Sequence, residues 1–224
     1  MLAVLRQCLG LFNRIPADKA ERLIHEAPLL AIDLELTSLD SAKAKVTSVG
    51  WVEGLGNTIN LDSCFYSVVR ASGDFAQSPV IHGLIQEHIA GGKHVRDVLK
   101  RLKTYADTHI WVFHNANLDL SILQRVFADT GIHCPPVMFI DTLKLAVYQL
   151  KKYHQILPPN SATLSVCRQR LGLPAAPAHN ALDDAMATLQ LWIAQNHALN
   201  GSKAIRFGDL LHTRAVDYRK MEKK

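Results

Sequence analysis

A run of four apolar residues that ends in two acids constrains this chain most. Leu29 to Ile32 is apolar, and Asp33 and Glu35 follow with leucines at positions 34 and 36. Because side chains alternate between the two faces of a strand, Asp33 and Glu35 project from the same face. A divalent cation relieves the repulsion between such carboxylates, and Mg²⁺ prefers hard oxygen ligands. Two solvated acids at a strand end are the alternative, but the apolar run favours a central strand.

A third carboxylate follows a second apolar strand. Residues 110–113 are apolar and β-prone, and apolar residues at helical spacing begin at Leu118. Asp119 therefore lies in the first turn of a helix that begins where the strand ends. Taken alone, Asp119 is explained equally well as a first-turn acid that the helix dipole stabilises.

A histidine and a fourth carboxylate lie at the start of a long helix late in the chain. Asn180 followed by Asp183 is a variant of the capping box, which makes Asp183 a solvated capping acid. On one continuous helix, His179 and Asp184 would diverge by about 140°. With His179 on the preceding loop, both side chains can face one site.

These stretches resemble the DEDDh 3′–5′ exonucleases of the DnaQ-like superfamily, which includes the proofreading subunit of bacterial DNA polymerase III, RNase T and oligoribonuclease. The family pattern is D-x-E, then H-N-A-x-x-D, then H-x-x-x-x-D. This chain has it at 33–35, 114–119 and 179–184, and the resemblance covers about 29–194. It implies metal-dependent release of nucleoside 5′-monophosphates from the 3′ end of mainly single-stranded DNA.

The resemblance also implies a role for each matching residue. Two Mg²⁺ or Mn²⁺ ions are held by Asp33, Glu35, Asp119 and Asp184. His179 accepts the proton of the attacking water, because an imidazole is mostly neutral at working pH. The substrate is contacted by Leu36, Thr37, His82 and Asn117.

One departure from the family pattern bears on the substrate. Ser38 stands where the family commonly has glycine, so we expect this turn either to tolerate a side chain or to adopt an ordinary φ. Leu36 is closer to the residue that oligoribonucleases have at this position than to the threonine usual in the family. An RNA-trimming exoribonuclease of the RNase T or oligoribonuclease kind is therefore kept as an alternative. A catalytically silent module that binds nucleic acid or a polymerase is the second alternative, and no ligand or histidine is missing to favour it.

The hydrophobic patterns predict an α/β fold. Strands are expected near 29–35, 46–53, 58–68, 110–114 and 137–141, and helices near 83–90, 95–107, 118–129, 142–153, 163–171 and 180–197. The first three strands form an antiparallel meander and the others add parallel strands. The result is a mixed five-stranded sheet flanked by helices, and the resemblance implies that this is the RNase H-like exonuclease fold. We divide the chain into a helical N-terminal extension (1–28), an exonuclease domain (29–197) and a basic C-terminal tail (198–224).

Composition limits the partners and the compartment. Residues 201–224 carry seven basic and three acidic residues, or +4 of the formal +5, which suits a polyanionic substrate unless the tail is merely solvated. The four cysteines include no C-x-x-C pair, so we expect reduced thiols and a cytoplasmic protein. No apolar run approaches the roughly 18 residues of a membrane span. The apolar segment 1–12 is expected to form an amphipathic helix rather than a signal peptide. Without a convincing clamp-binding peptide, we expect a stand-alone enzyme rather than a stable polymerase subunit.

Overall fold

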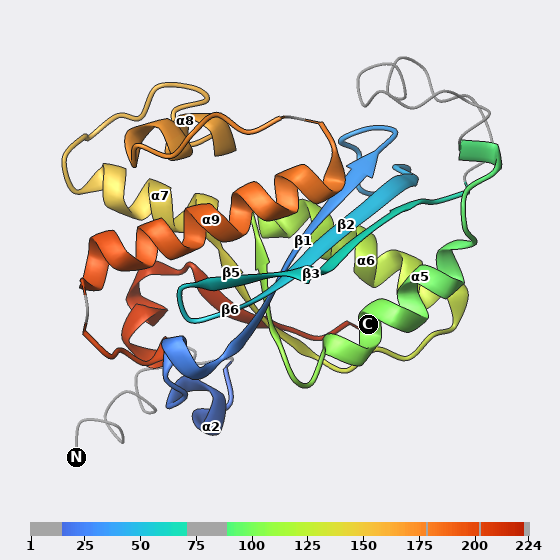
Figure 1. Ribbon diagram of the computed structural model, residues 1–224, viewed down its shortest axis with the longest axis horizontal. Helices are drawn as coiled ribbons and strands as arrows, with labels where there is room; N and C mark the ends of the chain where they lie inside the picture. Colours follow the sequence, from blue (N-terminus) through green and yellow to red (C-terminus); the bar gives the residue numbers. More distant parts are fainter. Residues whose placement is uncertain (1–14, 71–88, 178, 202, 222–224) are drawn as a thin grey trace.

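The computed structural model describes residues 15–70, 89–177, 179–201 and 203–221 (Figure 1). A single mixed sheet runs through this part of the chain in the order β3-β2-β1-β4-β5-β6. Its strands are β1 (Pro28–Leu36), β2 (Val46–Leu55), β3 (Thr58–Val68), β4 (Ile110–Phe113), β5 (Val137–Asp141) and β6 (Val216–Arg219). The helices are α2 (Ala17–Ala20), η1 (Ile24–Glu26), α5 (Val95–Leu102), η2 (Lys103–Tyr105), α6 (Ala116–Thr130), α7 (Thr142–Lys151), α8 (Leu164–Arg170), α9 (Ala181–Asn200) and η3 (Phe207–Thr213).

The sheet combines both pairing modes as predicted. Strands β1, β2 and β3 form the antiparallel meander, and β4 and β5 extend it in parallel to β1. The sheet has six strands rather than the predicted five, because β6 pairs antiparallel with β5. This sixth strand comes from the segment that the sequence analysis placed in the basic tail.

Helices cover both faces of the sheet (Figure 1). One apolar cluster joins α5 and α6 to side chains that include Trp51 and Trp111. The other joins α9 and η3 to side chains that include Leu29, Ala31 and Val52. Strand β1 is buried on both faces between these clusters, so a polar side chain on it must be accommodated within the protein.

Helix α9 lies unusually close to β2 because β2 presents glycines to it. A Cβ added to Gly50 would stand 2.3 Å from the backbone carbon of Ala181, and one added to Gly54 would stand 3.0 Å from Cδ2 of Leu189. Gly50 is also the register partner of Asp33 on the adjacent strand. The close approach therefore brings the first turn of α9 beside Asp33.

Two predictions fall partly or wholly outside the described residues. Residues 1–14 and 71–88 are not described, which leaves the opening amphipathic helix and nearly all of the expected 83–90 helix untested.

Ser38 is not among the described positions with positive φ, so the prediction of an ordinary φ there is confirmed. Each described helix is too short or too polar to span a bilayer.

Candidate active site

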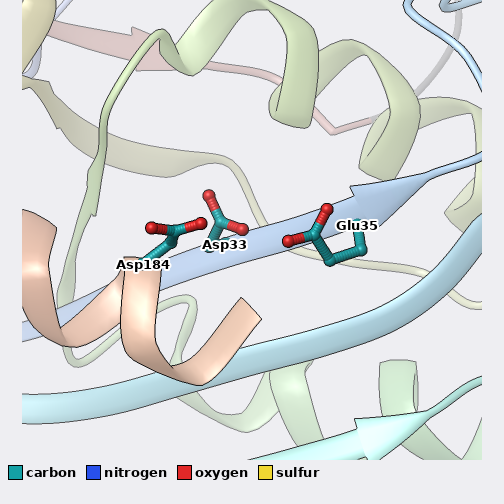
Figure 2. A group of neighbouring side chains, drawn as sticks. All are labelled: Asp33, Glu35 and Asp184. Carbon is teal, nitrogen blue, oxygen red and sulfur yellow. The ribbon is translucent and has the colours of Figure 1, made fainter. Parts of the chain in front are cut away.

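Three of the four predicted ligands meet at the carboxyl end of β1. Oxygens of Asp33, Glu35 and Asp184 all lie within 4.8 Å of one another. Figure 2 shows Asp33 and Glu35 projecting from the same side of β1 toward the first turn of α9, which carries Asp184. The alternation of the strand and the close contact at Gly50 together produce this cluster.

Asp119 reaches the same region from α6. It is buried, with 7% of its surface exposed, and it lies outside the group that meets within 4.8 Å. It is close enough to Asp33 and Glu35 to interact with both electrostatically. The structure therefore places all four predicted carboxylates at one end of the sheet, three as a tight cluster and one beside it.

Burial raises the pKa of every carboxylate in this set, and repulsion from neighbouring carboxylates adds to it. Burial is the main cause for Asp33, whose pKa is well above its usual range, and Asp119, Asp184 and Glu35 raise it further. Burial, followed by the charge of Asp184, raises the pKa of Glu35 to about 7. Burial also raises the pKa of Asp119 to about 8, although backbone hydrogen bonds from Asp119 itself and Leu34 oppose the shift.

The pKa of Asp184 is also raised, but contacts with His179 oppose the shift. Burial raises its pKa, while a hydrogen bond from the backbone of His179 and the charge of the His179 ring lower it, and Asp183 raises it slightly. The backbone N–H of His179 donates to Oδ2 of Asp184 at 3.1 Å. The predicted base and the predicted ligand are thus joined directly.

His179 precedes α9 on an exposed loop, as predicted. Its φ is +65°, an uncommon conformation for a residue other than glycine. Asn180 then caps α9 by accepting from the N–H groups of Leu182 and Asp183. Asp183 lies outside the 4.8 Å cluster, in agreement with the prediction that it is not a metal ligand.

His114, the first residue of the second motif, is fully engaged within the fold. Its Nδ1 lies 2.8 Å from Oγ1 of Thr142, and its Nε2 lies 2.9 Å from the carbonyl oxygen of Ala162. Because a carbonyl only accepts, Nε2 carries the proton. Burial lowers the pKa of His114, so it is a neutral structural link rather than a base at the cluster.

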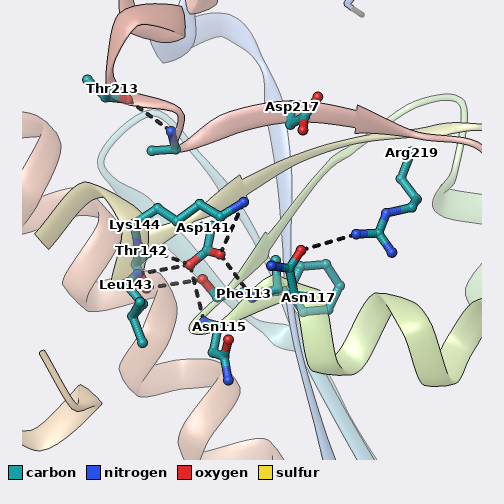
Figure 3. Close-up of polar contacts among 12 residues, drawn as sticks. Phe113, Asn115, Asn117, Asp141, Thr142, Leu143, Lys144, Thr213, Asp217 and Arg219 are labelled. Atoms are coloured by element: carbon teal, nitrogen blue, oxygen red, sulfur yellow. Dashed lines mark hydrogen bonds and ion pairs between the residues drawn. The ribbon is translucent and has the colours of Figure 1, made fainter. Parts of the chain in front are cut away.

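Sequence reasoning missed Asp141 as an organiser of the site. This residue is 1% exposed, caps α7, and accepts from the N–H groups of Asn115 and Ala116 at the start of α6 (Figure 3). It thereby fixes the helix that carries Asp119, and it also raises the pKa of that group. An acid directly after a buried strand and before a helix was the available signal.

The residues predicted to contact the substrate differ in their hydrogen bonds and in their place in the fold. Oδ1 of Asn117 accepts from Nη2 of Arg219 on β6 at 3.1 Å (Figure 3). Oγ1 of Thr37 accepts from the N–H of Lys45, and Leu36 ends β1 next to Glu35. His82 lies outside the described residues, so its contact with substrate stays a prediction.

A divalent cation fits this donor set. The neighbours that raise the pKa of Asp33 are all carboxylates. Two of them, Glu35 and Asp184, offer hard oxygen atoms within 4.8 Å of each other and of an Asp33 oxygen. Such groups cannot all be ionised near neutral pH unless positive charge compensates them. Either protons or metal ions must therefore be bound, and carboxylate oxygens are the ligands that Mg²⁺ and Mn²⁺ prefer.

Comparison with known proteins supplies an independent line of evidence. A family model described as Exonuclease (RNase_T) matches residues 30–192. A PolC-type DNA polymerase III from Thermotoga maritima is 28% identical over 169 residues, which are 75% of this chain and only 12% of that protein.

Two solved structures share the fold. Cell-death related nuclease 4 has a TM-score of 0.65 at 18% identity, over 80% of this chain and 66% of its own. Exonuclease X, solved in complex with 5′ overhanging duplex DNA, has a TM-score of 0.59 at 22% identity, over 81% of this chain and 98% of its own.

Proposed function

The chain belongs to the exonuclease family, and we propose that it removes nucleoside 5′-monophosphates from the 3′ end of mainly single-stranded DNA with the help of two Mg²⁺ or Mn²⁺ ions. The observation that carries the proposal is the cluster of Asp33, Glu35 and Asp184, with Asp119 beside it and His179 hydrogen-bonded to one member. The PolC-type relative supports DNA as the substrate class.

The residues divide the chemistry between them. The four carboxylates would hold the ions, which supply Lewis-acid stabilisation of the charge that develops on the phosphodiester. His179 would accept the proton of the attacking water at an imidazole nitrogen. The hydrogen bond from its N–H to Asp184 keeps this base on the same rigid unit as a ligand, which limits its positional freedom.

The end of β1 would bind the terminal sugar. Oγ1 of Thr37 already accepts a hydrogen bond from Lys45, which leaves the hydroxyl proton to donate to the substrate. Leu39, two residues further on, is 84% exposed and offers an apolar surface on which a base can rest. Leu36, Thr37, His82 and Asn117 remain the proposed substrate contacts.

Other aspects of function are proposals of the same kind. An RNA-trimming activity is the second candidate, because Leu36 resembles the residue that oligoribonucleases have at this position. Contacts to the 2′-OH are what would separate RNA from DNA here. A silent binding module is disfavoured by the complete ligand set. We propose a stand-alone cytoplasmic enzyme rather than a stable polymerase subunit.

The test follows 5′-labelled single-stranded DNA, duplex DNA and RNA of several lengths, each with Mg²⁺, with Mn²⁺ and with EDTA. A 3′–5′ exonuclease shortens the labelled strand progressively, whereas digestion from the 5′ end releases the label at once. Activity that survives excess EDTA would contradict the metal requirement. Faster loss of RNA than of DNA would favour the second candidate.

Two neighbouring acids give a matched pair of variants. Asp184→Asn should abolish cleavage, because it removes a charge from the cluster. Asp183→Asn changes the adjacent acid in the same helical turn, which lies outside the cluster, and should retain activity within a few-fold. Equal losses in both variants would show that the damage is to the helix start rather than to a metal ligand.

A further inference from the structure

Arg168 is a buried arginine without an acidic partner. It lies on α8 with 4% of its surface exposed, and no ion pair joins it to any carboxylate of the described residues. Its Nε has no hydrogen-bond partner in the described part of the chain. Burial of a guanidinium is unfavourable unless hydrogen bonds compensate for its lost hydration. A leucine or methionine would fill the same space at a lower desolvation cost.

Its two terminal nitrogens join α9 to the loop that leads to His179. Nη1 donates to the carbonyl oxygen of Ala187, within α9, and Nη2 donates to the carbonyl oxygen of Pro174, both at 2.9 Å. Ala187 lies three residues after Asp184 on the same helix. A single planar group therefore ties the histidine loop to the helix that carries a metal ligand.

The loop has few other attachments among the described residues. No hydrogen bond links Ala175, Ala176 or Pro177 to another described residue. The far end of the loop is fixed where the N–H of His179 donates to Asp184. Of the hydrogen bonds from Arg168 to Pro174 and from the backbone of His179 to Asp184, the one at Pro174 depends on a side chain outside the carboxylate cluster.

We propose that Arg168 is a positioning residue that fixes Pro174 against α9 and so helps to hold His179 beside Asp184. This inference rests on the proposed function, since it assigns a role toward the proposed base. A merely structural role, in which Arg168 only joins α8 to α9, is the competing explanation. The two differ in whether the effect of Arg168 passes through His179.

A double-mutant cycle separates these explanations. The turnover number and KM are measured on single-stranded DNA for the wild type, Arg168→Met, His179→Ala and the double variant, under conditions where circular dichroism shows each to be folded. Arg170→Met is the matched control, because this arginine of the same helix donates to the carbonyl of Ser161, away from the histidine loop.

If Arg168 positions His179, its replacement should change kcat and KM in a specific pattern. Arg168→Met should lower kcat by about 10- to 100-fold with little change in KM, since small misplacements of catalytic groups have effects of this size. In the His179→Ala background the same change should lower kcat by no more than about 2-fold. The Mn²⁺ affinity of Arg168→Met, measured by calorimetry, should equal that of the wild type. Arg170→Met should have the kcat and KM of the wild type.

Other outcomes overturn the inference. An equal loss of kcat in both backgrounds would assign Arg168 to structure alone, and an unchanged kcat in Arg168→Met would remove its role. If that variant does not fold, Arg168→Lys, which keeps one donor group, replaces it in the cycle and is judged by the same two results. A wild type that degrades no nucleic acid would instead refute the proposed function, and the positioning role with it.

Discussion

Replacement of Gly50 with alanine should damage catalysis although residue 50 carries no functional group. The added Cβ would stand 2.3 Å from the backbone of Ala181 and Leu182, at the start of α9. Ordinary contact begins near 3.4 Å, so α9 must retreat by about 1 Å. Backbone atoms cannot rotate away as a side chain can, so the whole first turn of α9 moves.

The size of the effect follows from this displacement. Asp184 lies in the turn that moves, while Asp33, the register partner of Gly50, stays on β1. A misplacement of about 1 Å at a reacting centre lowers the rate by about 10²-fold, and overpacking costs about 1–3 kcal/mol of folding free energy. We expect both losses in Gly50→Ala, together with weaker Mn²⁺ binding.

Gly54→Ala is the matched control. It adds the same atom to the same strand, against the side chain of Leu189 and the carbonyl of Thr58, farther along α9 from the cluster. Thermal unfolding and single-turnover cleavage should show lower stability in both variants but a large loss of rate only in Gly50→Ala. A wild-type rate in a destabilised Gly50→Ala protein would refute the argument that this glycine sets the position of Asp184.

Three further predictions concern the titrating groups of the site. His179→Ala should lower kcat by about 10²- to 10⁴-fold, the usual effect of losing a positioned base, with Mn²⁺ affinity nearly unchanged by calorimetry; a near-wild-type kcat would exclude His179 as the base. In the metal-free protein Glu35 has a folded-state pKa of about 7, above its unfolded value. The unfolded chain therefore loses this proton first, and the stability of the folded state falls as pH rises between the two pKa values. Glu35→Gln should therefore stabilise the metal-free protein by up to about 3 kcal/mol in denaturant unfolding at pH 8 and by little at pH 4; an equal gain at both pH values would point to another cause. Because Asp119 has a pKa of about 8, Mg²⁺ binding at pH 7 should release protons, seen as a calorimetric heat that depends on the buffer; a buffer-independent heat would contradict bound protons at the site.

The parts of the cluster could be predicted from the sequence because their rules are local, and the resemblance to the exonuclease family implied that these parts meet. Alternation along one strand places Asp33 and Glu35 on the same face, and the apolar run before them marks that strand as central. Helix-start signals placed Asp184 and His179 on the two sides of an N-cap. Each of these inferences needs only a few neighbouring residues, and each agrees with the structure.

The sixth strand could not be predicted for a complementary reason. Strand β6 has four residues, and the alternation that Val216 and Tyr218 provide is too short to mark a strand among charged neighbours. Its stability comes from pairing with β5 and from the contact between Arg219 and Asn117, which lie about a hundred positions apart in the chain. Charge suggested a basic tail that either serves a polyanionic substrate or is merely solvated, whereas residues 216–219 complete the sheet. A truncation after Asn200 would therefore remove structure as well as charge.

Both helices that carry a ligand begin after a residue in the left-handed conformation, and this shared feature connects the backbone to the chemistry. Asn115 precedes α6 with φ +76°, and His179 stands immediately before the cap of α9 with φ +65°. Such conformations cost of order 1–3 kcal/mol and persist only where surrounding contacts fix them. At each position a carboxylate accepts the N–H of the strained residue: Asp141 at Asn115, and Asp184 at His179. In the second case the accepting group is itself a proposed ligand. Oδ2 of Asp184 accepts from the backbone of the proposed base, and the same carboxylate belongs to the cluster, so the base and a proposed ligand are fixed to each other.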